Sequence, residues 1–314
     1  MDSTTNLELE VILAKLFVVQ NYELNEPDFY PQPPVKRDIL PADALPISPN
    51  NPPWNGWTAL GVWVASVIFI SVLQMLFLMP YLMRQPLDFS DKIGVMTFAK
   101  TDPTAILLQL IAVIPAHLFT FVLAWLVVTG FRKFAFRETL GWDLGRFRIW
   151  HAFVMFAGFY AIALVLAYIF GTSETDFDRM LKSSRSAVFL VAFFATFTAP
   201  LIEEVIYRGL LYSAFQRRFG VVLAVIFVTV LFTVVHIPQY SSESIPNYAS
   251  VIPLLLLSLT LTLLRVHTKN LLPCILLHTV VNAVQSVLLI LQPYIENYIK
   301  THQAETASLI QFFK

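Results

Sequence analysis

Residues 199–209 have the sequence Ala-Pro-Leu-Ile-Glu-Glu-Val-Ile-Tyr-Arg-Gly, and they end a run that is otherwise apolar. The preceding residues, 187–199, are almost all Val, Leu, Phe and Ala. A charge at the centre of a membrane helix costs roughly 2.5–3.5 kcal/mol on insertion scales. A chain that keeps Glu203, Glu204 and Arg208 together in this setting is expected to use them in its function. The alternative is a buried ion pair that locks two helices together.

The composition is that of a polytopic membrane protein. Of the 314 residues, 57% are hydrophobic and only 13% are charged, whereas about 25% of a typical soluble domain is charged. The mean hydropathy is +0.67. Because the formal net charge is zero, no bulk attraction to nucleic acid is expected. The single cysteine, Cys274, excludes an intrachain disulfide.

The order of apolar and polar segments predicts the fold. Residues 1–53 are expected to lie outside the membrane, and Pro27–Pro53 holds nine of the nineteen prolines, which favours an extended linker. Residues 54–314 are expected to form a membrane-embedded domain. Seven apolar runs in it are long enough, or nearly so, for membrane helices: 57–83, 104–129, 149–170, 187–202 (able to continue to Gln216), 221–236, 250–266 and 271–291. We therefore predict an all-α fold, a polytopic transmembrane helical bundle of about seven to eight spans.

The basic residues predict the orientation. With the N-terminus in the cytoplasm, twelve Lys and Arg fall on the inner side and eight on the outer side. The positive-inside rule favours this arrangement. We expect an integral protein of the cell inner membrane, in contact with membrane lipids, with a cytoplasmic N-terminus.

Helix geometry separates the two glutamates. At 3.6 residues per turn, Glu204 and Arg208 lie one turn apart on one face, which suits an ion pair. Glu203 points about 100° away from Glu204. Arg208 is therefore expected to neutralise Glu204 and to leave Glu203 free as a general base. The alternative is that both acids share Arg208.

Two further polar clusters lie in the later runs, Phe232 to His236 and His278 to Asn282. His236 precedes Ile237-Pro238, where the helix must stop, and its imidazole can hold a water against a carboxylate of another helix. Alone, it is more often a structural or interfacial residue. His236 and Glu203 can meet only if the fourth helix continues past Glu203.

His278 and Asn282 form an i,i+4 pair on one helix face. Both can donate hydrogen bonds to one point and form an oxyanion hole. The alternative is an interhelical hydrogen-bond pair, worth about 0.6 kcal/mol in membrane bundles. His117 and His151 lie outside the clusters and are interpreted as structural or interfacial.

Several other chemistries lack their motifs. No His-Glu-x-x-His, phosphate loop, dinucleotide fingerprint or Gly-x-Ser-x-Gly is present. The glutamates and histidines of the clusters still include enough candidate ligands to leave a metal site open. A small proton-coupled transporter is a further alternative, although the first three runs offer little polarity for a path.

The ordered motifs Glu-Glu-x-x-x-Arg (203–208), Phe-x-x-x-His (232–236) and His-x-x-x-Asn (278–282) resemble those of the CPBP family. This family of CAAX proteases and bacteriocin-processing enzymes is also called the ABI family. The resemblance covers residues 187–291. It implies an all-helical intramembrane endopeptidase that uses glutamate, with no cofactor and no metal.

Carried over by motif position, the resemblance implies a role for each polar residue. Glu203 activates water, His236 orients that water, His278 and Asn282 form the oxyanion site, and Glu204 and Arg208 support the arrangement. The expected reaction is hydrolysis of a peptide bond in a membrane-associated protein or peptide, with a prenylated CAAX tail as one substrate class. The main alternative is a non-catalytic immunity or scaffold protein of the same family.

Overall fold

The computed structural model describes residues 46–171, 174–242 and 245–312. Most of the predicted extramembrane segment, residues 1–53, therefore lies outside the described residues. The described chain from Ile47 onward forms one compact unit. It is all-helical apart from a two-stranded antiparallel sheet of β1 (Ser241–Ser242) and β2 (Ile245–Pro246).

The first half of this unit contains three long helices, which match the first three apolar runs. They are α2 (Gly56–Leu82), α4 (Pro103–Val128) and α6 (Ile149–Phe170), and the short helices α3 (Lys92–Thr101), α5 (Phe136–Leu140) and α7 (Asp176–Ser183) lie in the connections. Polar caps set several starts. Asn55 accepts a hydrogen bond from the N–H of Thr58 at α2, and Asp102 accepts one from Ala105 at α4.

The fourth span is longer than the predicted 187–202. It runs through α8 (Arg185–Phe193), the π-helical turn η2 (Phe194–Thr198), α9 (Ala199–Glu204), the π-helix η3 (Val205–Leu211) and α10 (Tyr212–Phe219). The chain reverses at Gly220, whose φ of +83° lies in the left-handed region that favours glycine. The fourth helix thus continues past Glu203, as a meeting with His236 requires.

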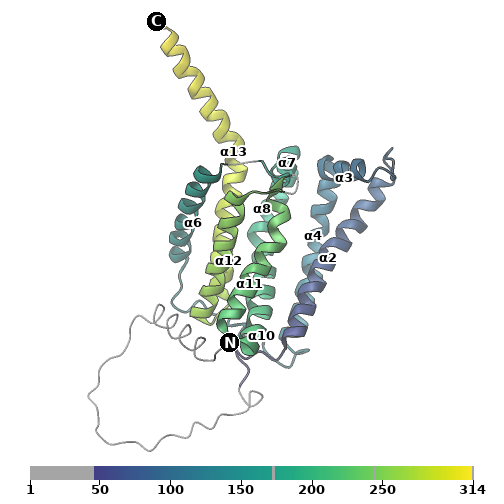
Figure 1. The fold of residues 1–314 in the computed structure, drawn as a ribbon, viewed down its shortest axis with the longest axis vertical. Coiled ribbons are helices and arrows are strands. Elements are labelled where there is room, and N and C mark those ends of the chain that lie inside the picture. Colours follow the sequence, from purple (N-terminus) through teal and green to yellow (C-terminus); the bar gives the residue numbers. More distant parts are fainter. Residues whose placement is uncertain (1–45, 172–173, 243–244, 313–314) are drawn as a thin grey trace, which may run out of the picture. The chain divides into compact units, whose positions relative to one another are not determined.

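The remaining spans complete the bundle. They are α11 (Val221–His236), which continues into the 3₁₀ turn η4 (Ile237–Tyr240), then α12 (Tyr248–Thr268) and α13 (Leu272–Phe312). Helices α11 and α12 lie side by side, as do α12 and α13 (Figure 1). Helix α13 extends well past the predicted end at residue 291. Within the described residues, seven segments are long and apolar enough to cross a membrane, which confirms the predicted fold class.

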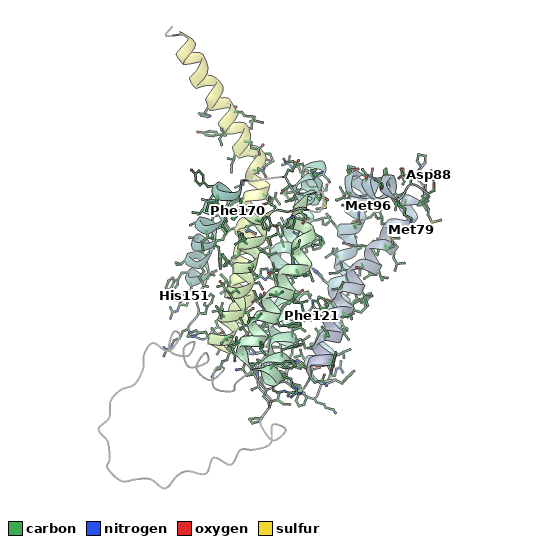
Figure 2. All side chains as sticks on the ribbon, viewed as in Figure 1. Met79, Asp88, Met96, Phe121, His151 and Phe170 are labelled. Atoms are coloured by element: carbon green, nitrogen blue, oxygen red, sulfur yellow. The ribbon has the colours of Figure 1, made fainter. Side chains whose placement is uncertain are left out.

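The core is centred on the stretch that contains the charged motif. Leu210, Leu211 and Tyr212 are almost fully buried, and they pack against α2, α4, α5 and α11. In contrast, the most apolar stretch of α6 has no buried residue. His151 and Phe170 mark the two ends of this helix in Figure 2. Helix α6 packs against α12 and α13 on one side, and its many exposed apolar side chains fit contact with lipid chains.

Candidate active site

The two adjacent glutamates lie between two π-helical turns. Pro200, near the start of α9, has no N–H to donate to residue 196, so the α-helical ladder is broken there and η2 precedes it. The π-helix η3 follows Glu204 directly and contains Arg208. Single π-helical turns inside α-helices occur frequently at functional sites. The local backbone therefore singles out residues 203–208.

Glu204 forms a fully buried ion pair with Arg208. Their side chains are 0% exposed, and Nη1 of Arg208 lies 3.0 Å from Oε1 of Glu204. Helix spacing predicted this pair, and the structure contains it. The other donors of Arg208 bind α12: Nη2 donates to the carbonyl and hydroxyl oxygens of Ser258, both at 2.9 Å, and Nε lies 3.3 Å from Oγ1 of Thr262. Four polar contacts from two elements thus fix one guanidinium.

His278 brings α13 to the same carboxylate. Its Nδ1 lies 2.8 Å from Oε1 of Glu204. Because an ionised carboxylate only accepts hydrogen bonds, Nδ1 carries the proton. The opposite ring nitrogen, Nε2, faces Glu203 at 3.9 Å from Oε2. Glu204 therefore sets the orientation of the His278 ring toward the second glutamate.

Glu203 is the accessible member of the pair, with 24% of its side chain exposed. Its Oε1 lies 3.9 Å from Nε2 of His236, and its Oε2 lies 3.9 Å from Nε2 of His278. These separations are too long for direct hydrogen bonds but leave room for one bridging water. Among the described residues no arginine or lysine forms an ion pair with Glu203, as predicted. The carboxylate thus faces two imidazoles with a polar gap between them.

His236 is held by its own helix end. Its Nδ1 lies 2.7 Å from the carbonyl oxygen of Phe232, one turn earlier. A carbonyl only accepts, so Nδ1 donates and Nε2 is left for Glu203. The ring of Phe232 lies 4.5 Å from the His236 ring and 4.7 Å from Cζ of Arg208. Phe232 therefore packs between the buried ion pair and the half-buried histidine.

Comparison with known families agrees with this geometry. Residues 185–284 match the family described as "Type II CAAX prenyl endopeptidase Rce1-like", which is about a third of the chain. The chain contains an Rce1-like domain. This confirms the resemblance inferred from the three motifs, and all six residues predicted for the site fall inside the match. Searches of curated proteins and of solved structures gave no significant match.

Asn282 lies on the same helix of the Rce1-like domain as His278, with a different partner. Its Nδ2 donates to the carbonyl oxygen of Ala195 in η2 at 2.9 Å. Asn282 thus joins α13 to the first π-helical turn. A shared oxyanion site of Asn282 and His278 stays a prediction.

Sequence reasoning set aside one histidine that the structure brings to the site. His117, in the middle of α4, lies 2.9 Å from Oγ1 of Thr198 through Nδ1, and its ring packs edge-on against Phe194. It is close enough to Glu203 for the two side chains to interact electrostatically. The feature of the sequence that could have identified His117 as a site residue is its imidazole within an apolar run. His151, by contrast, accepts a hydrogen bond from the N–H of Arg148 at the start of α6 and is partly exposed, which fits its interfacial interpretation.

A metal site finds little support in the side-chain geometry. Across the described ranges, no three His, Cys, Asp or Glu side chains converge as metal ligands do. The carboxylate of Glu203 lies instead 3.9 Å from the imidazoles of both His236 and His278. This spacing suits hydrogen bonding through a small polar molecule such as water.

Proposed function

We propose that the protein is an intramembrane endopeptidase that hydrolyses a peptide bond with a water activated by Glu203. The observation that carries the proposal is the partly exposed carboxylate of Glu203, placed 3.9 Å from the Nε2 atoms of His236 and His278. A general base must reach its proton directly or through one water. The Rce1-like match over residues 185–284 supports the same reaction class.

The proposed reaction begins with a water between Glu203 and His236. Glu203 takes one proton from the water, and the oxygen attacks the carbonyl carbon of the scissile peptide bond. The C–N bond of the tetrahedral intermediate then breaks. The protonated Glu203 returns the proton to the leaving amine, which regenerates the carboxylate. Proton transfer by a positioned side chain typically contributes about 10²–10⁴-fold to the rate.

The developing oxyanion needs donors, and His278 and Asn282 are proposed to supply them. Nδ1 of His278 donates its proton in a hydrogen bond to Glu204. Nε2 can therefore donate only when the ring is doubly protonated. The charges then balance: Glu203 and Glu204 are negative, and Arg208 and His278 are positive. One N–H of Asn282 donates to the Ala195 carbonyl, which leaves its second N–H as the proposed donor to the oxyanion.

The substrate is proposed to be a membrane-associated protein or peptide. The family description names a prenyl CAAX endopeptidase, so a prenylated C-terminal CAAX peptide is the first substrate to test. The protein is proposed to lie in the cell inner membrane with its N-terminus in the cytoplasm. Arg208 and Arg265 are buried inside the bundle and do not contribute to the surface charge balance. Without them, the inner side retains ten Lys and Arg against eight on the outer side.

The deciding experiment compares membranes that carry the native chain, Glu203→Gln or Glu296→Gln. Glu203→Gln keeps the size of the side chain and removes the base, whereas Glu296 is exposed and remote from the motif. New peptide termini are catalogued in all three, and a prenylated CAAX peptide is added to purified protein. Termini that appear with the native chain and with Glu296→Gln, but not with Glu203→Gln, establish proteolysis. Identical catalogues with all three proteins folded would favour the non-catalytic immunity or scaffold alternative.

A further inference from the structure

Residues 47–54, here called the strap, lie before the first span and outside the Rce1-like match. Ser48 and Asn51 pair through their backbones, with N···O distances of 3.2 and 3.0 Å, which folds the segment into a turn. Three of the eight residues are prolines, which lack a donor and offer only carbonyl oxygens. Such a segment binds most readily to a surface that supplies donors.

The Rce1-like domain supplies those donors from α10 and α12. Nη1 and Nη2 of Arg217 donate to the carbonyl oxygens of Pro52 and Trp54 at 2.7 and 3.1 Å. Nε2 of Gln216 donates to the carbonyl oxygen of Asn50 at 3.1 Å. Arg265 of α12 donates to the carbonyl oxygen of Pro49 at 2.6 Å and to Oδ1 of Asn50 at 3.2 Å. The strap therefore bridges two helices of the domain.

Arg265 depends on the strap for its acceptors. Its side chain is 1% exposed, and its Nε is buried without a hydrogen-bond partner. Within the described part of the chain, no carboxylate forms an ion pair with it, and its other close contact is the ring of Tyr212, 5.6 Å from Cζ. A buried guanidinium without acceptors is strongly unfavourable. The strap oxygens thus supply the acceptors that offset the cost of burying Arg265.

Trp54 connects the strap to the catalytic helix. It is 4% exposed, and its Nε1 donates to the carbonyl oxygen of Leu210 at 3.0 Å. Leu210 lies in η3, two residues after Arg208. A second indole acts on the same π-helix, since Nε1 of Trp63 in α2 donates to the hydroxyl oxygen of Tyr207 at 3.0 Å. Two tryptophans from outside the family match therefore hold the segment that follows Glu203 and Glu204.

We propose that the strap is a positioning element of the active site, with Trp54, Arg217 and Arg265 as its positioning residues. It fixes α12 through Arg265 and η3 through Trp54. Both elements hold Arg208, whose donors reach Ser258 and Thr262 of α12 and Glu204 beside the catalytic base. The catalytic part of this inference rests on the proposed function. The placement of α12 by the strap does not.

The native cysteine gives a readout that is independent of activity. Cys274 in α13 is the single cysteine of the chain and is 0% exposed. Its Sγ lies 3.3 Å from the carbonyl oxygen of Leu261, one turn before Arg265 on α12. A loosened α12 exposes this thiol between α12 and α13. Labelling by a small neutral maleimide therefore reports whether the strap holds α12 in place.

The experiment uses the full-length protein in detergent micelles and two pairs of matched variants. Arg217→Gln removes the donors to the strap, and its control is the neighbouring Arg218→Gln. Trp54→Phe removes the indole donor, and its control is Trp57→Phe, a tryptophan that is 82% exposed. We expect Arg217→Gln and Trp54→Phe to raise the labelling rate of Cys274 at least fivefold, with no change in either control. Equal rates in all four variants would overturn the proposal.

A second readout addresses catalysis on a cleaved peptide. Misplaced catalytic groups lower the rate of the chemical step, so Trp54→Phe is expected to lower kcat about tenfold, per folded protein, with unchanged KM. Arg217→Lys, which keeps one donor, is expected to recover part of the kcat lost in Arg217→Gln. If Glu203→Gln abolishes cleavage while the strap variants keep native kcat and labelling, the strap proposal fails and the proposed function stands. If the native chain cleaves nothing, the labelling still decides whether the strap places α12.

Discussion

The ring of His278 joins the two adjacent glutamates, with Nδ1 2.8 Å from Oε1 of Glu204 and Nε2 3.9 Å from Oε2 of Glu203. Glu204 is fully buried with Arg208, whereas Glu203 is accessible. The same residue type therefore has two roles, set by environment. One carboxylate orients a histidine, and the other is partly accessible and faces two imidazoles.

Glu204→Gln is expected to destabilise the protein strongly, by about 3–5 kcal/mol, because it leaves the buried Arg208 without its counter-charge. The double variant Glu204→Gln with Arg208→Met removes both charges and is expected to be more stable than the single variant. Equilibrium unfolding in mixed micelles measures both. A single variant with native stability would show that the ion pair contributes nothing to folding.

Phe232→Leu tests the aromatic ring between Arg208 and His236. The substitution keeps an apolar side chain and removes contacts of the ring with Arg208 at 4.7 Å, Tyr207 at 5.0 Å and His236 at 4.5 Å. We expect a loss of about 1–2 kcal/mol in stability and about a tenfold lower kcat, since His236 loses its packing.

The control for this ring is Phe227→Leu on the same helix. Phe227 stacks on Phe215 at 4.3 Å, away from the glutamates. This variant is expected to lose stability while kcat per folded protein stays native. Equal effects of both substitutions on kcat would show that Phe232 has no special relation to the site.

His117→Gln tests the histidine that sequence reasoning set aside. It removes the ring that binds Thr198 and interacts with Glu203, so kcat is expected to fall several-fold, less than in His236→Gln. His151→Gln is the matched control, because His151 lies partly exposed at the start of α6 and its Nδ1 hydrogen-bonds to the backbone of Arg148. Cleavage of a peptide by equal amounts of folded protein measures the difference. Native kcat in His117→Gln would assign His117 to packing alone.

The membrane fold and one ion pair could be predicted from sequence because both depend on local pattern. Long apolar runs define spans, and the spacing of Glu204 and Arg208 places them on one helix face. The third predicted span, 149–170, coincides with α6 (Ile149–Phe170). The fourth run, predicted over 187–202 with a continuation to Gln216 allowed, belongs to a span that ends at Phe219. Its charged residues interrupt the apolar pattern although the helix buries Glu204 and Arg208.

Other features depend on packing between distant segments, which a single sequence does not reveal. The hydrogen bonds of Trp54 to Leu210 and of His117 to Thr198 join residues far apart in the chain. The π-helical turns η2 and η3 were also not predicted, and they change the angular relation of residues on either side. For this reason the partner of Asn282, the carbonyl of Ala195, could not be found by helix spacing.

Orientation in the membrane can be tested with single introduced cysteines. Ser90 lies in the connection between α2 and α4, and Asp143 lies in the connection between α5 and α6; both are exposed. The proposed cytoplasmic N-terminus puts Ser90 outside and Asp143 inside. A membrane-impermeant maleimide added to intact cells should label Ser90→Cys and not Asp143→Cys, and the buried Cys274 should give little background. The opposite pattern would reverse the orientation.

Gly141→Ala tests how the connection before α6 supports the helix that contains His278. Gly141 has a φ of +73°, and its carbonyl oxygen accepts a hydrogen bond from the N–H of Leu271 at 2.8 Å, at the start of α13. An added Cβ would lie 2.9 Å from the backbone Cα of Asn270. The backbone of residues 269–271 must therefore shift, which lowers stability. The left-handed conformation of a non-glycine residue costs about 1–2 kcal/mol more, comparable to a lost hydrogen bond.

Gly145→Ala separates the cost of the left-handed conformation from the cost of the backbone contact with Asn270. Gly145 also has a positive φ, of +55°, but nothing lies within 4 Å of an added Cβ. We therefore expect Gly145→Ala to lose only the conformational part and to keep native kcat. Gly141→Ala should lose more stability and also kcat, because the start of α13 sets the position of His278, six residues after Leu272. Equal unfolding free energies and equal kcat for the two variants would show that the contact between residues 141 and 270 does not place α13.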